Sequence, residues 1–251
     1  MLYGAYLSAT GMAINSHQQD VIANNLANAD TAGFKRDQAV FQERLQEAQV
    51  NLRNRSFLPA NLKSATGGAF VADTHTDLSQ GGISLTRRNL DVALTGSGYL
   101  AVQDGDQVRY TRDGRLAVVE GKLVRQTDGK AVLDESGREI ALSEASAGDV
   151  RIDTEGNVTV RNQPVGKLGL TAFNNPQDLQ KVGANLYDAV GQPPRDVEIS
   201  LVPEALETST VSPTYELVEM IKVSRGFQLN AQMLGLQDQT LGRLVSELPR
   251  I

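Results

Sequence analysis

The chain contains no cysteine and no tryptophan among its 251 residues. Without cysteine, a disulfide framework and a cysteine-ligated metal site are both excluded. Aromatic residues make up only 5% of the chain, which is few for a protein that stacks nucleic-acid bases. The formal net charge is −6, whereas a nucleic-acid binder needs lysine and arginine to neutralise phosphates. These absences argue against a nucleic-acid partner.

Long apolar runs are missing too, because no stretch approaches the ~20 apolar residues that cross a bilayer. We therefore expect no direct insertion into a membrane. No lysine or arginine precedes Lys35, so we also expect no cleavable secretory signal peptide. If the protein leaves the cytoplasm, it does so by another route.

Residues that carry catalysis are scarce, because two histidines and no cysteine leave few acid–base or nucleophilic arrangements. Gly96-Ser97-Gly98 matches the start of a dinucleotide-binding motif, but the residues after it predict a strand, which favours a tight turn between strands. Asp73, His75 and Asp77 alternate as metal ligands would, yet a fourth ligand is missing nearby, which favours a solvated loop. We expect a protein that is not an enzyme, with no catalytic, cofactor-binding or metal-binding residues.

The N-terminal segment predicts a long helix of unusually low charge. Leu7, Ile14 and Val21 recur every seven residues, and Asp20 is the only charged side chain between residues 2 and 29. A free surface helix normally carries lysine and glutamate on its outer face. We therefore expect both faces to be covered in the working state, although an ordinary polar helix of a monomer remains the alternative.

The C-terminal segment predicts a second, longer helix. No proline interrupts it between Pro213 and Pro249, so it can extend for ~50 Å. Its apolar residues also recur every seven positions, whereas Asn230 and Gln237 are polar at the matching positions and would set register at some cost in stability. The repeating apolar residues are Met220, Phe227, Leu234, Leu241 and Leu248.

The residues between these helices predict turns and strands. Asp30-Thr31-Ala32-Gly33-Phe34 ends the first helix, residues 36–49 predict a further helix carrying Val40, Phe41 and Leu45, and residues 51–70 predict a loop. From about residue 78 to 202, short strand-like runs alternate with turn signals, which is typical of antiparallel hairpins. The signals are Asp104-Gly105, Asp113-Gly114, Glu120-Gly121, Asp128-Gly129, Ser136-Gly137 and Glu155-Gly156. The predicted fold class is α+β, with the terminal helices paired as an antiparallel coiled-coil domain and a central all-β domain.

Four segments carry a more specific signal. Residues 23–36 (Ala-Asn-Asn-Leu-Ala-Asn-Ala-Asp-Thr-Ala-Gly-Phe-Lys-Arg) closely resemble the N-terminal motif of bacterial flagellar rod and hook proteins. Residues 90–100 are similar to the central motif of that family, residues 110–114 to the motif that follows it, and residues 220–230 to its closing helix. The segment before the last helix, with Pro213, and residues 77–81 are most like the proximal rod branch (FlgF), with the distal rod branch (FlgG) as the alternative.

The resemblance implies a structural subunit of the flagellar basal-body rod, whose partners are itself, other rod proteins and the flagellar type III export apparatus. It implies the domains 1–30 (N-terminal helix), 31–77 (linker and subunit contact), 78–202 (outer β-rich domain) and 203–251 (return linker and C-terminal helix). It also implies a periplasmic place in the basal body, reached by export without cleavage. A soluble binding module with helices closed on the β-domain is the alternative from another class. The expected assembly interface comprises Leu7, Ile14, Val21, Asn24, Asn25, Leu26, Asn28, Phe34, Met220, Phe227, Leu234, Leu241 and Leu248.

Overall fold

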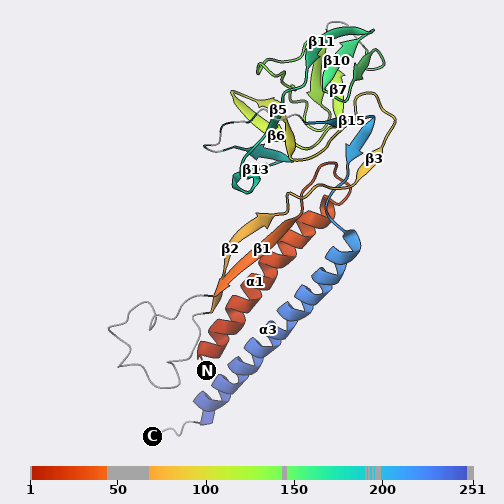
Figure 1. The fold of residues 1–251 in the computed structure, drawn as a ribbon. Helices are drawn as coiled ribbons and strands as arrows, with labels where there is room; N and C mark the ends of the chain where they lie inside the picture. The colour runs from red at the N-terminus through yellow and green to blue at the C-terminus, as the bar shows by residue number, and fades with distance from the viewer. Residues whose placement is uncertain are drawn as a thin grey trace. The chain divides into compact units, whose positions relative to one another are not determined.

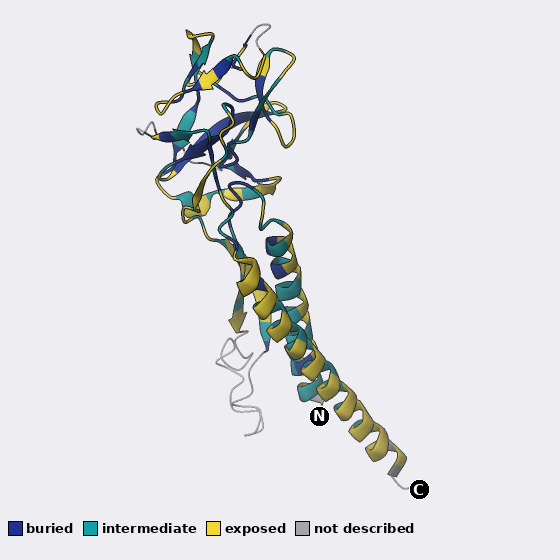
Figure 2. Cartoon of the chain, turned by 90° about the vertical axis from the view of Figure 1, so that its right-hand side faces the viewer, coloured by how far each residue is buried: buried dark blue, intermediate teal, exposed yellow. Residues whose placement is uncertain are grey.

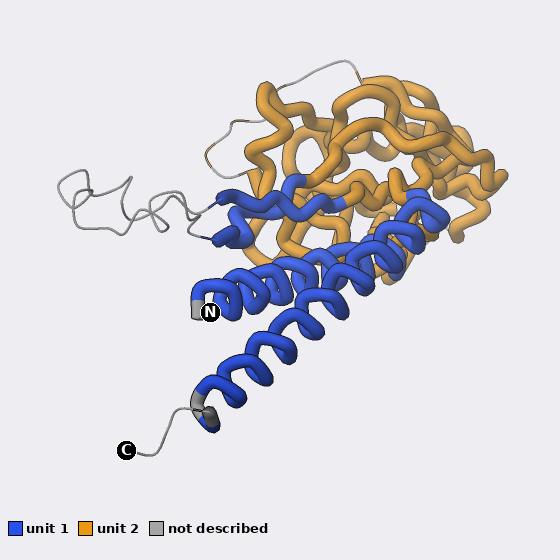
Figure 3. Tube along the Cα trace, turned by 90° about the horizontal axis from the view of Figure 1, so that it is seen from below, with its two compact units in different colours: residues 1–27, 37–75, 212–251 blue, residues 28–36, 76–211 orange. Residues whose placement is uncertain are grey.

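A computed structural model of the chain describes residues 2–43, 68–142, 146–189, 191, 193, 195 and 199–247. In this part of the chain the fold is α+β, with two long helices and many short strands (Figure 1). The chain divides into two compact units (Figure 3). The first, called the helical unit below, contains residues 1–27, 37–75 and 212–251, and the second, called the strand unit, contains residues 28–36 and 76–211.

The helical unit is built from helices α1 (Leu2–Ala27) and α3 (Pro213–Glu247) and from the paired strands β1 (Asp37–Glu43) and β2 (Ala69–Thr76). Pro213 is the first residue of α3, where its fixed φ suits a helix and its missing N–H costs nothing. The Glu216 amide then donates to the Ser212 carbonyl at 3.0 Å in the first turn. Neither helix is apolar enough along its described length to cross a membrane.

The prediction of a helix over residues 36–49 is wrong where it can be examined. Residues 37–43 form β1, in which half-buried and exposed side chains alternate, and residues 44–49, including Leu45, lie outside the described residues. Val40 and Phe41 favour strands, and pairing with β2 satisfies the backbone hydrogen bonds of this segment. Asp73 and His75 likewise lie exposed on β2 rather than in a loop.

The strand unit is built from antiparallel pairs. Its largest sheet has five strands in the order β12 (Leu170–Ala172), β5 (Gly98–Asp104), β6 (Gln107–Thr111), β14 (Leu186–Asp188) and β13 (Gln180–Gly183). A three-stranded sheet has the order β11 (Gln163–Lys167), β10 (Asn157–Val160) and β9 (Val150–Ile152). Three two-stranded pairs join β15 (Leu201–Pro203) to β4 (Val92–Leu94), β16 (Ala205–Glu207) to β3 (Ile83–Leu85), and β7 (Leu116–Val119) to β8 (Lys122–Arg125). A short 3-10 helix, η2 (Pro176–Asp178), precedes β13.

Most of the turn signals in the sequence are confirmed as turns. Gly96 lies between β4 and β5 with φ +79°, so the glycine motif there is a turn between strands. Glu120 and Gly121 both have positive φ in the hairpin between β7 and β8, as a two-residue turn requires. Arg161 and Asn162 make the equivalent turn between β10 and β11 without glycine, and the sequence did not predict it.

The apolar core lies within the strand unit (Figure 2). Eighteen buried aliphatic side chains from β4, β5, β7–β10, β12, β14, β15 and intervening segments form one cluster, which includes Leu94, Leu100 and Leu116. A second cluster is aromatic, and Tyr99 meets Phe173 and Tyr187 at ring-centroid distances of 5.8 and 5.6 Å. The strand unit therefore has the buried apolar surface that a stable domain needs.

Candidate assembly interface

The two helices of the helical unit are antiparallel and packed in a single register. A Cβ added to Gly4 would lie 2.7 Å from Gln237 Nε2, and one added to Gly11 would lie 2.7 Å from Asn230 Nδ2. Gly226 faces Asn15 in the same way, with a distance of 3.1 Å to Asn15 Nδ2. A step of seven residues toward the C-terminus of α1 corresponds to a step of seven toward the N-terminus of α3.

The predicted heptad residues lie on the facing sides of this helix pair. Leu7, Ile14 and Val21 are half-buried, as are Met220, Phe227, Leu234 and Leu241, whereas Leu248 lies outside the described residues. The register places Leu7 level with Leu234, Ile14 with Phe227, and Val21 with Met220. The face of α1 is nevertheless smaller and more polar than the sequence suggested, because Gly4, Ser8, Gly11 and Asn15 occupy it.

The opposite face of α3 carries exposed apolar side chains, separated by polar ones such as Arg225 and Gln232, which periodicity alone did not reveal. Val218, Ile221, Leu229 and Leu236 have exposed fractions of 47, 54, 62 and 57%. At 100° per residue they lie on the side of α3 turned away from its half-buried heptad positions. Figure 2 shows the exposed colour along this helix. We call these four residues the outer stripe of α3.

Asn25 is fully buried and holds the end of α1 to the start of β1. Its Nδ2 donates to the Asp37 carbonyl at 2.8 Å, and its Oδ1 accepts from the Asp37 amide at 2.9 Å. Its Nδ2 also lies 3.5 Å from Glu216 Oε2 at the start of α3. Its neighbour Asn24 is exposed, and Leu26 is half-buried. The Asn25 side chain therefore connects three segments within one subunit.

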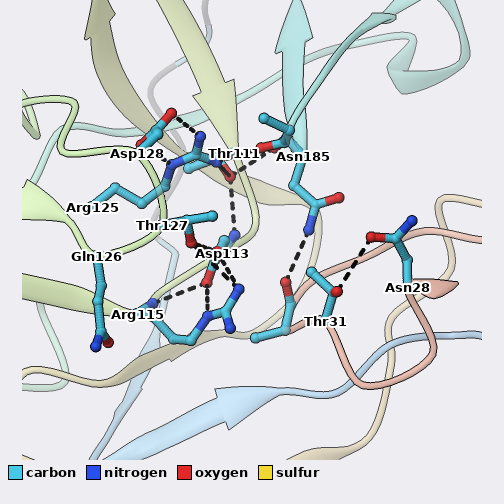
Figure 4. A network of polar contacts seen from close by, with 12 residues as sticks. Asn28, Thr31, Thr111, Asp113, Arg115, Arg125, Gln126, Thr127, Asp128 and Asn185 are labelled. Atoms are coloured by element: carbon cyan, nitrogen blue, oxygen red, sulfur yellow. Dashed lines mark hydrogen bonds and ion pairs between the residues drawn. The ribbon is translucent and has the colours of Figure 1, made fainter.

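Residues 28–36 belong to the strand unit and are bound into it by backbone and side-chain contacts (Figure 4). Thr31 Oγ1 donates to Asn28 Oδ1 at 3.3 Å, and Asn185 Nδ2 donates to the Ala32 carbonyl at 3.2 Å. Phe34 is only 4% exposed, and the Lys181 ammonium lies 4.1 Å from its ring centroid. Gly33 has φ +66°, and a Cβ there would lie 2.5 Å from the Arg112 backbone. Asn28 itself is half-buried.

Figure 4 also shows the hydrogen bonds around Asp113, one residue of the 110–114 motif. Its carboxylate accepts from the Arg115 guanidinium at 2.8 and 2.9 Å and from Thr127 Oγ1 at 2.8 Å. Arg125, fully buried, forms an ion pair with Asp128 and donates to the Ala184 carbonyl at 2.8 Å. Each of these charged groups is thus paired within the strand unit, as burial requires.

Lys35, Arg112 and Glu207 form a buried ion cluster, and none of them was predicted as a site residue. Lys35 Nζ lies 2.6 Å from Glu207 Oε1, and Arg112 Nη1 lies 3.4 Å from Glu207 Oε2. All three side chains are at most 2% exposed. Lys35 also donates to the Ser79 carbonyl at 2.5 Å, and Glu207 accepts from the Gly81 amide at 2.7 Å. The cluster joins segments that are far apart in the sequence.

Burial is the dominant influence on the cluster lysine and lowers the pKa of Lys35 below its ordinary value, although Glu207 acts in the opposite direction. Burial also raises the pKa of Tyr99, against the effect of Arg112, whose guanidinium lies 4.8 Å from the Tyr99 ring centroid. Arg112 donates to the Gly96 carbonyl at 2.6 Å, so the cluster reaches the 90–100 motif as well.

The family-like motifs therefore meet in one place. Residues 30–35 supply Lys35, residues 110–114 supply Arg112, and residues 90–100 supply the Gly96 carbonyl. Gly114 packs so tightly that a Cβ would lie 1.7 Å from the Val92 carbonyl oxygen. These contacts hold the motifs together within the strand unit. Among the described residues, no group of three or more His, Cys, Asp or Glu side chains could hold a metal ion.

Comparison with known families gives three matches, all to flagellar proteins. The model described as flagella basal body rod protein matches residues 6–35. The flagellar hook protein FlgE/F/G D1 domain matches residues 93–160, and the flagellar basal body rod FlgEFG protein C-terminal model matches residues 202–247. The matches follow one another along the chain and include α1, the strand unit and α3.

Curated relatives extend the similarity over nearly the whole chain. The flagellar basal-body rod protein FlgG of Bacillus subtilis (strain 168) is 30% identical over 262 residues, covering 98% of this chain and 99% of the relative. FlgG of Buchnera aphidicola subsp. Acyrthosiphon pisum is 32% identical, with coverages of 97 and 99%. FlgF of Caulobacter vibrioides is 33% identical over 222 residues, with coverages of 86 and 85%.

Proposed function

Since the chain belongs to the flagellar basal-body rod protein family and is a structural rod subunit, we propose that it self-assembles through its terminal helices into the axial shaft that transmits torque to the hook. The observation that carries this proposal is the outer stripe of α3, whose four apolar side chains are about half exposed. A row of exposed apolar side chains along one side of a helix is a candidate surface for protein–protein contact. Repetition of one such contact between copies builds an open helical array.

The low charge of α1 supports the same proposal. Asp20 is its only charged side chain, and its remaining polar groups are hydroxyls, amides and one imidazole. Burying these groups between subunits costs less than burying ammonium or carboxylate groups. We propose that α1 and α3 act as an antiparallel coiled-coil core domain, that residues 31–77 contribute a linker and subunit contact, and that residues 78–202 form an all-β outer domain.

The family also suggests a place and partners. Its members are named for the flagellar basal body, and we propose that this chain lies in the periplasmic part of the rod beside other rod proteins. We further propose that it reaches that place through the flagellar type III export apparatus without cleavage of its N-terminal region.

Within the family we propose the proximal position. The relative named FlgF is 33% identical and those named FlgG are 30 and 32% identical, so identity does not favour the distal alternative. Residues 77–81 and Pro213 support the proximal position on motif similarity. Immunolabelling of purified basal bodies tests the proposal directly, and a signal confined to the hook-proximal end of the rod would contradict it.

Assembly through α3 is tested by placing charge on the outer stripe. Leu229→Asp with Leu236→Asp should leave the subunit folded, because both positions are exposed in it. The pair should abolish incorporation into the rod and swimming in a null strain, because assembly would bury two carboxylates without partners. A matched control is Val119→Asp with Val165→Asp, which places two charges on exposed valines of the strand unit. Normal incorporation of the α3 variant, or equal loss with the control, would contradict assembly through the helices.

The alternative of a closed binding module predicts a different behaviour of the isolated chain. Hydrogen exchange of dilute monomer should show weakly protected amides in α1 and α3 if these helices are stabilised by neighbours. Strong protection there, equal to that of β5 and β6, would favour the closed module.

A further inference from the structure

The contact between α1 and α3 contains three glycine–amide pairs, separated by seven and then four residues along each helix. Gly4 faces Gln237, Gly11 faces Asn230, and Gly226 faces Asn15. In the first two pairs the glycine is on α1 and the amide on α3, whereas in the third the roles are exchanged. The three pairs share one register, and each amide occupies the space that its glycine leaves open.

Apolar contacts alone do not select this register. A slide of α3 by one heptad, about 10.5 Å along the helix axis, would bring Leu241 level with Leu7 and Leu234 level with Ile14. The apolar residues would again face one another. Asn15, however, would then be level with Met233 instead of Gly226. Gly11 would again face an amide, Gln237, but Gly4 would be level with Leu244. The pairs Gly4–Gln237 and Asn15–Gly226 therefore distinguish two registers that the leucines do not.

We propose that these three pairs specify the register of α1 against α3, as positioning residues of the helical unit. Polar residues at helix-contact positions commonly fix register and lower stability. Their cost is visible here, because Gln237 Oε1 is buried without a hydrogen-bond partner among the described residues. The proposal concerns the subunit itself and holds whether or not the outer stripe mediates assembly.

Because the chain has no native cysteine, disulfide formation measures the register cleanly. In the full-length protein, Leu7→Cys with Leu234→Cys places the two thiols at positions that are level in the observed register and leaves all three pairs intact. Leu7→Cys with Leu241→Cys is the reference for the register displaced by one heptad. A disulfide requires Cα atoms within about 7 Å, so the first pair should form a disulfide at least about tenfold faster.

The pairing itself is tested by exchanging its partners. In the Leu7→Cys, Leu234→Cys background, Gly11→Asn sets two amides against each other and should slow the disulfide about tenfold, because a Cβ there lies 2.7 Å from Asn230 Nδ2. Adding Asn230→Gly restores a glycine–amide pair in the reverse orientation, which Asn15 and Gly226 already use. The exchanged variant should recover to within about twofold of the background.

Gly235→Asn is the matched control, because Gly235 is exposed on α3 with no atom near the position of a Cβ, and it should leave the rate unchanged. Equal disulfide rates for the in-register and displaced pairs would overturn the proposal. Failure of Asn230→Gly to restore the rate in the Gly11→Asn variant would overturn it as well. An equal slowing by Gly235→Asn would attribute the effect to helix propensity and would also overturn it.

Discussion

For the buried ion cluster, the charges of its members predict which of two substitutions destabilises the strand unit more. Lys35, Arg112 and Glu207 together carry a net charge of about +1 in the folded strand unit. Lys35→Met leaves Glu207 paired with Arg112, so the cluster becomes neutral. Glu207→Gln leaves two buried cations with no carboxylate between them. Glu207→Gln should therefore destabilise the strand unit more than Lys35→Met.

The magnitudes follow from the contacts that remain. Removing the shared partner of a buried ion pair costs about 3–5 kcal/mol, which applies to Glu207→Gln. Lys35→Met leaves the Ser79 carbonyl without its 2.5 Å hydrogen bond, a loss of about 1–3 kcal/mol. Since 1 kcal/mol shifts the midpoint of a domain of this size by about 2–4 °C, we expect decreases of about 10 °C and about 5 °C.

The assay is thermal unfolding followed by near-ultraviolet circular dichroism of tyrosine. Tyr99 and Tyr187 are buried in the strand unit, so their signal reports its folding, while Tyr3, Tyr6 and Tyr215 on the helices are exposed. A midpoint for Lys35→Met at or below that for Glu207→Gln would refute the charge argument.

The pH dependence supplies an independent check on the same cluster. Because the pKa of Lys35 is lower in the folded state than its ordinary value of 10.5, the unfolded chain binds more protons between those two values. Stability should therefore rise with pH through that window, and the rise should be absent in Lys35→Met. The raised pKa of Tyr99 acts in the opposite direction above pH 10, where stability falls as the unfolded tyrosine ionises.

Two further predictions concern the strand unit. Gly114→Ala should lower its stability by more than about 3 kcal/mol in urea unfolding, because a Cβ would overlap the Val92 carbonyl, whereas Gly148→Ala, which meets no neighbour, should have little effect. Burial raises the pKa of Asp128, but the Arg125 guanidinium outweighs burial and the net pKa lies below 3.8. Stability should therefore fall as pH drops below 3.8, and a steeper fall in Asp128→Asn than in the unchanged chain would contradict this assignment.

The sequence predicts local structure here better than it predicts contacts between distant segments. The heptads of both terminal segments locate α1 and α3, and the glycine turn signals locate most hairpins, because both depend on neighbouring residues. The ion cluster was missed because Lys35 and Glu207 are 172 positions apart and each is an ordinary charged residue in isolation. Strand β1 was assigned to a helix because its pairing with β2 comes from a segment beyond position 68.

Low charge in a segment indicates burial but does not say what buries it. Asn25 and Phe34 were predicted as assembly residues, yet their side chains are buried within their own units, so substitutions there would act first on folding of the subunit. Gly226 of α3 makes room for Asn15 of α1, because a Cβ there would lie 3.1 Å from Asn15 Nδ2. Leu229 and Leu236 of the outer stripe remain more than half exposed, and it is on this stripe that we propose the contacts between copies. On that proposal, the motif typical of the family shapes the subunit, and less distinctive leucines meet the neighbouring copies.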